Sequence, residues 1–174
     1  HSSALQEARV MLTKEIRNGW AASATGYAAV ISSIAKCGYE GWTIKTGNSY
    51  GVALPAPQNM VVSEKFAGAH LYTDTIILDG VKKQPALLLM ARSEDIKGPF
   101  STLCAELLYP GVDGKFREEI LSSPTTWWMQ WKELLGNRNV DERVYDVLGE
   151  LLTLRYLASH GENAEWNGPT GATY

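Results

Sequence analysis

The sequence predicts an α+β fold, in which an N-terminal domain with an antiparallel sheet is flanked by helices. Apolar residues recur at helical spacing near the start of the chain. Between about residues 42 and 92 the spacing changes to that of strands, and turn sequences separate the runs. Helical spacing returns from residue 96 onward.

Two helices are expected before the first strand. Over residues 4–18 one face is apolar and the opposite face is charged, which indicates an amphipathic helix ended by Gly19. The apolar positions are Leu5, Ala8, Leu12 and Ile16. Residues 25–37 also have apolar residues at helical spacing, so they predict a second helix that stops at Gly38.

The middle of the chain predicts about four antiparallel strands. Residues 42–46 and 50–55 flank the turn sequence Gly47-Asn48-Ser49, which is typical of a hairpin. Residues 69–80 and 84–92 are two further β-rich runs, joined through residues 79–83. The last run is so apolar that we expect both of its faces to be buried.

Three helices are expected after the sheet. An apolar stripe runs from Ile96 to Leu108, a second helix covers residues 115–121, and Pro124 lies near the start of a third. Trp128, Trp131 and Leu135 share one face of that third helix, which predicts a hydrophobic seam between helices. A base-stacking platform is the alternative, and nothing in the sequence favours it. We expect a domain boundary near residues 111–114, which separates domain 1–110 from 111–174.

Charge and composition narrow the classes of function. Residues 1–110 carry 10 basic and 9 acidic residues, so no strongly basic field indicates nucleic-acid binding. Residues 111–174 carry 6 basic and 10 acidic residues, which is compatible with a divalent-cation site. No apolar run is long enough for a membrane span, and no signal peptide is recognised, so we expect no membrane partner. Cys37 and Cys104 are far apart, which favours reduced thiols in a cytoplasmic protein.

Residues 141–174 carry the most informative pattern. Apolar residues recur at helical spacing up to Gly161, and Glu150 lies at the edge of the resulting stripe. The sequence Asn167-Gly168-Pro169-Thr170-Gly171 is a turn, so its flanks predict a short hairpin. On this pattern alone, we expect Glu150 to be a solvated residue on the flank of the helix, because most carboxylates on helices are solvated.

The segments GELLTLRYL and AEWNGPTGATY resemble a known family, the PD-(D/E)XK motif proteins of restriction and phage-defence operons. In that family a helix with the pattern G-E-L-x-x-L precedes W-x-G-P-x-G. Gly149-Glu150-Leu151 and Trp166–Gly171 match in order and spacing, and the similarity covers about residues 127–174. The resemblance implies a helical segment followed by the first helix and hairpin of a restriction-endonuclease-like α/β core.

The resemblance also implies an activity, Mg²⁺-dependent cleavage of DNA. Phosphodiester hydrolysis of this kind uses Mg²⁺ held by carboxylate oxygens. Glu150 matches the helix glutamate of the family and is therefore the candidate catalytic residue and metal ligand. The first catalytic Asp is expected directly after Tyr174 and a Glu-x-Lys strand after that. These 174 residues therefore do not include either motif. We expect the chain to be the N-terminal portion of an endonuclease and to be inactive alone.

A non-catalytic role is the alternative. In that interpretation the sheet of residues 40–92 binds DNA or a partner subunit of a restriction-like complex, and the 141–160 helix is structural. The near-neutral charge of residues 1–110 fits a protein partner better than a phosphate backbone. His70 and His160 have no partners at metal-ligand spacing, and each is expected to be a surface or half-buried residue.

Overall fold

The computed structural model describes residues 2–22 and 27–136 of the chain. Secondary structure follows in the order α1 (Ser2–Ala22), β1 (Tyr27–Val30), α2 (Ser32–Lys36), β2 (Trp42–Thr46), β3 (Ser49–Pro55), β4 (Ser63–Phe66), β5 (Ala69–Leu78), β6 (Lys82–Ala91), α3 (Lys97–Leu108), α4 (Lys115–Ser122) and α5 (Pro124–Gly136). Short 3₁₀ turns, Glu94–Ile96 and Val112–Gly114, precede α3 and α4. The α+β class predicted from the sequence is confirmed.

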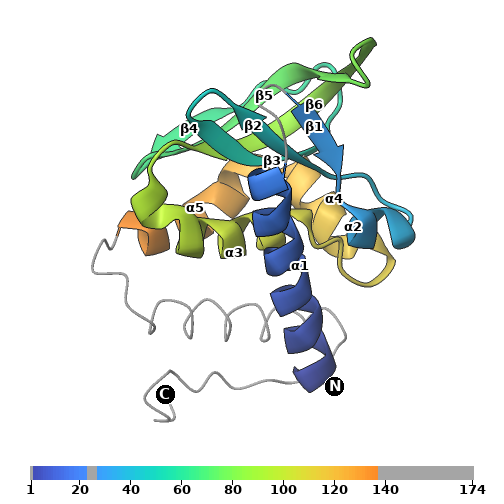
Figure 1. The fold of residues 1–174 in the computed structure, drawn as a ribbon, viewed down its shortest axis with the longest axis vertical. Helices are drawn as coiled ribbons and strands as arrows, with labels where there is room; N and C mark the ends of the chain where they lie inside the picture. Colours follow the sequence, from blue (N-terminus) through green and yellow to red (C-terminus); the bar gives the residue numbers. More distant parts are fainter. Residues whose placement is uncertain (1, 23–26, 137–174) are drawn as a thin grey trace.

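The six strands of the described residues form one antiparallel sheet with the order β1-β2-β3-β6-β5-β4. Figure 1 shows this sheet as one layer, with α1, α3 and α5 together on one of its faces. The predicted hairpin around Gly47 is confirmed, since β2 and β3 flank it. The predicted pairing of the two long runs is also confirmed, as β5 and β6.

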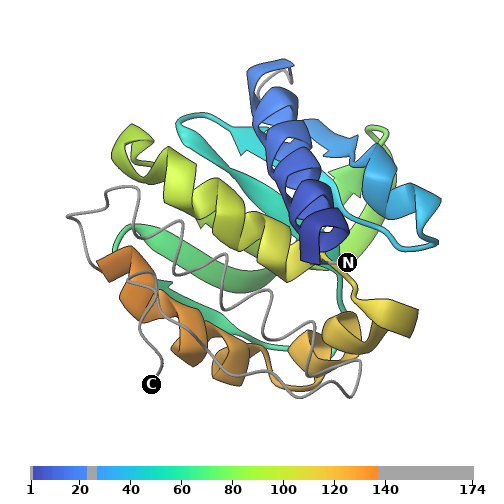
Figure 2. The same cartoon turned by 90° about the horizontal axis from the view of Figure 1, so that it is seen from below.

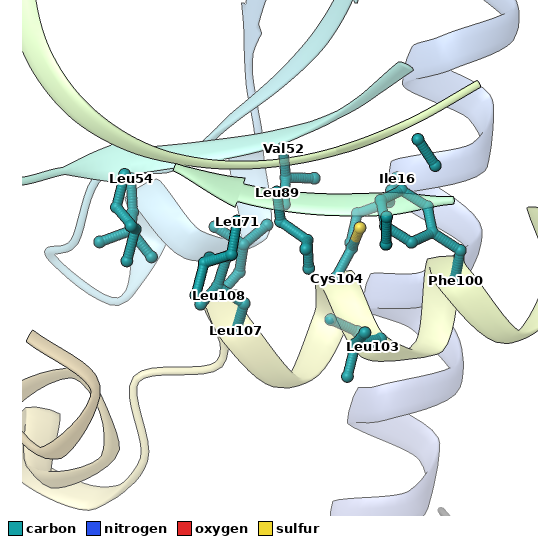
Figure 3. Packing of buried hydrophobic residues seen from close by; sticks show 14 of the residues in the cluster. Ile16, Val52, Leu54, Leu71, Leu89, Phe100, Leu103, Cys104, Leu107 and Leu108 are labelled. Atoms are coloured by element: carbon teal, nitrogen blue, oxygen red, sulfur yellow. The ribbon is translucent and has the colours of Figure 1, made fainter. Parts of the chain in front are cut away.

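The main hydrophobic core lies between the sheet and the helices. Viewed from below, α1 and α3 lie across the sheet face (Figure 2). Sheet residues Val52, Leu71 and Leu89 point toward α3, which presents its own apolar side chains to them (Figure 3). Those α3 residues are Phe100, Leu103, Cys104, Leu107 and Leu108, and all five are buried. The apolar stripe that predicted this helix therefore forms one wall of the core.

A second apolar cluster covers the opposite face of the sheet, which we call the outer face. Its buried residues are Trp42, Ile44, Ala53, Ile76, Leu78, Ala86, Leu88 and Met90. Strands β1 and β5 come into contact although they are not neighbours in the sheet order, so the sheet curls over this cluster. The curl explains why the residues from Ala86 to Ala91 are all buried, as their continuous apolar run predicted.

The prediction that Gly19 ends the first helix is wrong. Helix α1 continues through Gly19 to Ala22, because Trp20 on its last turn is buried in the main core. A Cβ at position 19 would lie 2.7 Å from Oγ1 of Thr43. Glycine is therefore needed here for the close approach of helix and sheet, and its helix-stopping tendency is overridden.

The prediction of one helix over residues 25–37 is also wrong. Residues Tyr27–Val30 form edge strand β1, and only Ser32–Lys36 are helical before the chain turns at Gly38. Pairing with β2, in which Val30 lies opposite Trp42, outweighs the helical spacing of a short apolar run. The expected number of about four strands is too low. The two additional strands, β1 and the polar strand β4, had no clear strand pattern in the sequence.

The helices after residue 114 agree with their predicted positions. Residues of α4 and α5, including Ile120 and Trp128, belong to the same main core as α3. The boundary expected near residues 111–114 stays a prediction, because the elements beyond residue 136 lie outside the described residues. No helix in the part of the chain that the structure describes is long and apolar enough to cross a membrane.

Candidate functional site

Glu150, the residue expected to be catalytic and to bind metal, lies outside the described residues. The same is true of His160 and of the Trp166–Gly171 motif. Within residues 2–22 and 27–136, no group of three His, Cys, Asp or Glu side chains could hold a metal ion. The described residues alone do not fit a Mg²⁺ site, so the nuclease site stays a prediction of the sequence.

A cluster of polar and aromatic side chains lies on the outer face where β4 pairs with β5. We call it the β4–β5 cluster, and it consists of Ser63, Lys65, His70 and Tyr72. Ser63 lies opposite Tyr72 and Lys65 opposite His70, so all four side chains project from the same face. The hairpin turn at residues 67–68 brings the four residues together.

His70 is the centre of the β4–β5 cluster. Its Nε2 atom lies 3.0 Å from Oγ of Ser63, and its ring stacks on Tyr72 with 4.2 Å between ring centroids. His70 is half-buried, which confirms the expectation made from its sequence surroundings. The contact between Ser63 and His70 could be predicted from the sequence only by recognising β4, because the register of the β4–β5 hairpin brings the two residues together.

The pKa values of the two rings in the cluster are shifted in the directions that favour their neutral forms. Burial, followed by the nearby charge of Lys65, lowers the pKa of His70 below 6.5. Burial and then the charge of Asp74 raise the pKa of Tyr72. Near neutral pH the cluster therefore presents an uncharged imidazole, a phenol and a hydroxyl, with Lys65 as its cation.

The Ser63 and His70 pair lacks the arrangement of a nucleophilic triad. Such a triad needs a carboxylate that orients the second ring nitrogen of the histidine. Asp74 is on the same face, but four residues along an extended strand place it about 13 Å away between Cα atoms. Its Oδ1 instead accepts a hydrogen bond from the backbone N–H of Thr75 at 2.7 Å. The cluster can therefore offer a ligand hydrogen bonds and ring stacking.

The tryptophans of α5 are part of the core. Trp128 and Trp131 are both buried in the main cluster, so the predicted seam between helices is confirmed for these two residues. Trp127, which the spacing argument did not include, is buried beside them. The indole N–H groups of Trp127 and Trp131 have no hydrogen-bond partner in the described structure. Because the rings of all three tryptophans are buried, they have no open face on which a base could stack.

Two arginines of the described residues are buried, and the contacts of Arg117 show a structural role. Arg117 donates to the carbonyl oxygens of Glu40 and Leu108, each at 3.0 Å, and its guanidinium lies 5.5 Å from the centre of the Tyr39 ring. It thereby ties α4 to the loop before β2 and to the end of α3. Arg9 on α1 is buried, and the charge of Glu106 on α3 opposes the lowering of the Arg9 pKa by burial.

Comparison of the chain with protein-family models, with curated proteins and with solved structures found no significant match in any of the three.

Proposed function

We propose that this chain is the N-terminal part of a Mg²⁺-dependent DNA endonuclease of the PD-(D/E)XK type, acting in restriction or phage defence. The observation that carries the proposal is the order and spacing of Gly149-Glu150-Leu151 and Trp166–Gly171. The acidic balance of residues 111–174 is consistent with it, since hard divalent cations prefer carboxylate oxygens. The described α+β domain then precedes the nuclease core as an accessory domain.

In this proposal Glu150 contributes one carboxylate to a metal site. Bound Mg²⁺ would polarise the phosphate and activate water. The remaining carboxylates would come from an Asp and a Glu-x-Lys motif encoded after Tyr174. The Asp should follow Tyr174 directly and, because hairpin strands are short, the Glu-x-Lys motif should lie within about 30 residues of it. The coding sequence downstream of the Tyr174 codon tests this directly, and absence of either motif there overturns the nuclease proposal.

The role of Glu150 is tested by Glu150→Gln in the full-length protein. If Glu150 binds the metal, the variant loses most or all DNA cleavage while its Tm stays nearly unchanged, because charge is removed without changing side-chain volume. Glu142→Gln, in the first turn of the predicted helix, is the matched control and should keep full activity. A large loss of Tm with retained cleavage means that Glu150 is structural.

A second candidate function is that of an assembly module, which binds a protein subunit of a restriction-like complex. The near-neutral charge of residues 1–110 favours it over a role in DNA binding. A gel-shift titration at several salt concentrations separates the two cases. Binding of DNA that weakens steeply with salt would contradict the assembly role, because release of counterions is typical of phosphate contacts.

A further inference from the structure

The sheet has one open edge in the part of the chain that the structure describes. Among residues 2–22 and 27–136, strand β4 ends the sheet order and pairs with β5 alone. The opposite edge, β1, is partly closed by its contact with β5. Open edges present unpaired backbone groups that can bind a further strand. Strand β4 is therefore the place where the sheet can be extended.

The register identifies which backbone groups of β4 are free. The N–H of Thr73 donates to the carbonyl of Val62 at 3.0 Å, so these two residues form a hydrogen-bonded pair. Hydrogen-bonded and non-bonded pairs alternate along an antiparallel ladder. The backbone groups of Glu64 and Phe66 consequently face β5, whereas those of Ser63 and Lys65 face away from the sheet.

The side chains along this edge alternate in character between the two faces. Val61, Ser63 and Lys65 project from the outer face and are exposed, Val61 to 89%. Glu64 and Phe66 project from the helix face, where Nζ of Lys132 lies 5.7 Å from the centre of the Phe66 ring. A strand that pairs here meets the Lys65 cation on the outer face, and on the helix face it meets the Glu64 carboxylate and the Phe66 ring with Lys132 beside it.

A second copy of this chain is a poor occupant of the edge. A two-fold antiparallel pairing keeps each face of the sheet on the same side, so residues of the same face must lie opposite one another. The two registers with the largest overlap then place either Glu64 opposite its own symmetry mate or Lys65 opposite its own. Like charges directly across a ladder are destabilising, so β4 is protected against self-pairing.

We propose that β4 binds an extended segment of a partner protein as a seventh, antiparallel strand. The segment carries an acidic residue opposite Lys65, a basic residue opposite Glu64 and an apolar residue opposite Phe66. Backbone hydrogen bonds to Ser63 and Lys65 hold the segment, and the two charge pairs select its sequence and register. This inference rests on the second candidate function, because it names how a protein partner is bound.

Two peptides of the same composition test the charge pattern. In Thr-Val-Glu-Lys-Thr-Val, the acidic and basic residues lie opposite Lys65 and Glu64 when the first valine of the peptide faces Phe66. In Thr-Val-Lys-Glu-Thr-Val, both positions meet like charges. With fluorescent peptides and the 174-residue chain, anisotropy titrations should give about tenfold tighter binding of the first peptide. Methylation of its amide nitrogens at the third and fifth positions should abolish binding.

Exchange of the two charges on the protein provides the reciprocal test. The double variant Glu64→Lys, Lys65→Glu should bind the second peptide more tightly than the first. The matched control is the exchange Lys115→Glu, Glu118→Lys on exposed positions of α4, which should leave the preference unchanged. Circular dichroism and Tm check that both variants fold.

Several results overturn the proposal. These are equal affinity for both peptides, no binding of either, binding that survives methylation, or a preference that the double variant does not reverse. A dimer in sedimentation that the double variant alters would assign the edge to a second copy instead. A partner that co-purifies equally well with the double variant overturns the edge site but leaves the assembly function standing, so the two failures are distinguishable.

Discussion

The indole N–H of Trp20 donates a hydrogen bond to the carbonyl oxygen of Gly51 at 2.8 Å. This bond joins the last turn of α1 to the centre of β3, and both groups are buried. The Trp20 ring also packs edge-on against Tyr50 and stacks on Phe100, with centroid distances of 4.8 and 6.0 Å. Trp20 therefore fastens the N-terminal helix to the sheet at one defined position.

Trp20→Phe should lower the free energy of unfolding by about 1–3 kcal/mol, because it leaves the Gly51 carbonyl without this buried donor. Trp127→Phe is the matched control. Trp127 is also buried, but its indole N–H has no hydrogen-bond partner in the described structure, so its loss should cost less. Urea denaturation measures both values. Equal losses would mean that ring volume, and not the hydrogen bond, accounts for the effect.

Gly51→Ala should destabilise the fold by about 3 kcal/mol or more. A Cβ at position 51 would lie 1.9 Å from the carbonyl oxygen of Leu89 and 2.7 Å from Sδ of Met90, and the backbone of β6 cannot move aside alone. Gly41→Ala is the comparison, since its Cβ would meet the flexible end of Leu108 at 3.0 Å. We expect a loss of about 1 kcal/mol there. Thermal and urea unfolding that rank the two variants in reverse would contradict this packing argument.

Ala67→Asn should raise the stability of the β4–β5 hairpin. Ala67 and Gly68 form the two-residue turn with φ angles of 51° and 86°, and Ala is disfavoured in this left-handed region. Asn tolerates the region, so we expect a gain of about 0.5–1 kcal/mol. Ala67→Val should have the opposite sign, because a β-branched side chain is strained there. Equilibrium unfolding of the two variants checks the signs.

His70 should titrate below 6.5 in an NMR experiment on the folded chain. Because the pKa in the folded state is lower than in the unfolded state, the unfolded chain binds its proton first as the pH falls. The His70 contribution to stability is therefore complete above 6.5 and is lost as the pH falls through the folded pKa. The groups that face the ring are Ser63, Lys65 and Tyr72, and Asp74 lies further along the same face.

Lys65→Gln should raise the pKa of His70 part of the way back toward 6.5. The recovery is incomplete because burial is the larger cause of the shift. Lys115→Gln, on the exposed surface of α4, should leave it unchanged. A folded pKa at or above 6.5 in the wild-type chain would contradict the arrangement of the β4–β5 cluster.

Strong local patterns predicted most of the described fold. The turn at Gly47, the two long runs that form β5 and β6, and the apolar stripe of α3 were each recognisable because the pattern extends over many residues. The short strands β1 and β4 were not recognisable, since four residues carry too little periodicity to outweigh an overlapping helical or polar pattern. The β4–β5 cluster was missed with β4, because its members meet only through the hairpin register.

The sequence by itself determined the α+β class, the position of the long elements and the motif around Glu150, since each is written in residue spacing and turn chemistry. Only the tertiary structure decided that Gly19 lies inside a helix, that Tyr27–Val30 is a strand and that the sheet curls over a second core. The physical reason is that long-range contacts outweigh weak local preferences. Burial of Trp20 extends α1, and pairing with β2 extends the sheet.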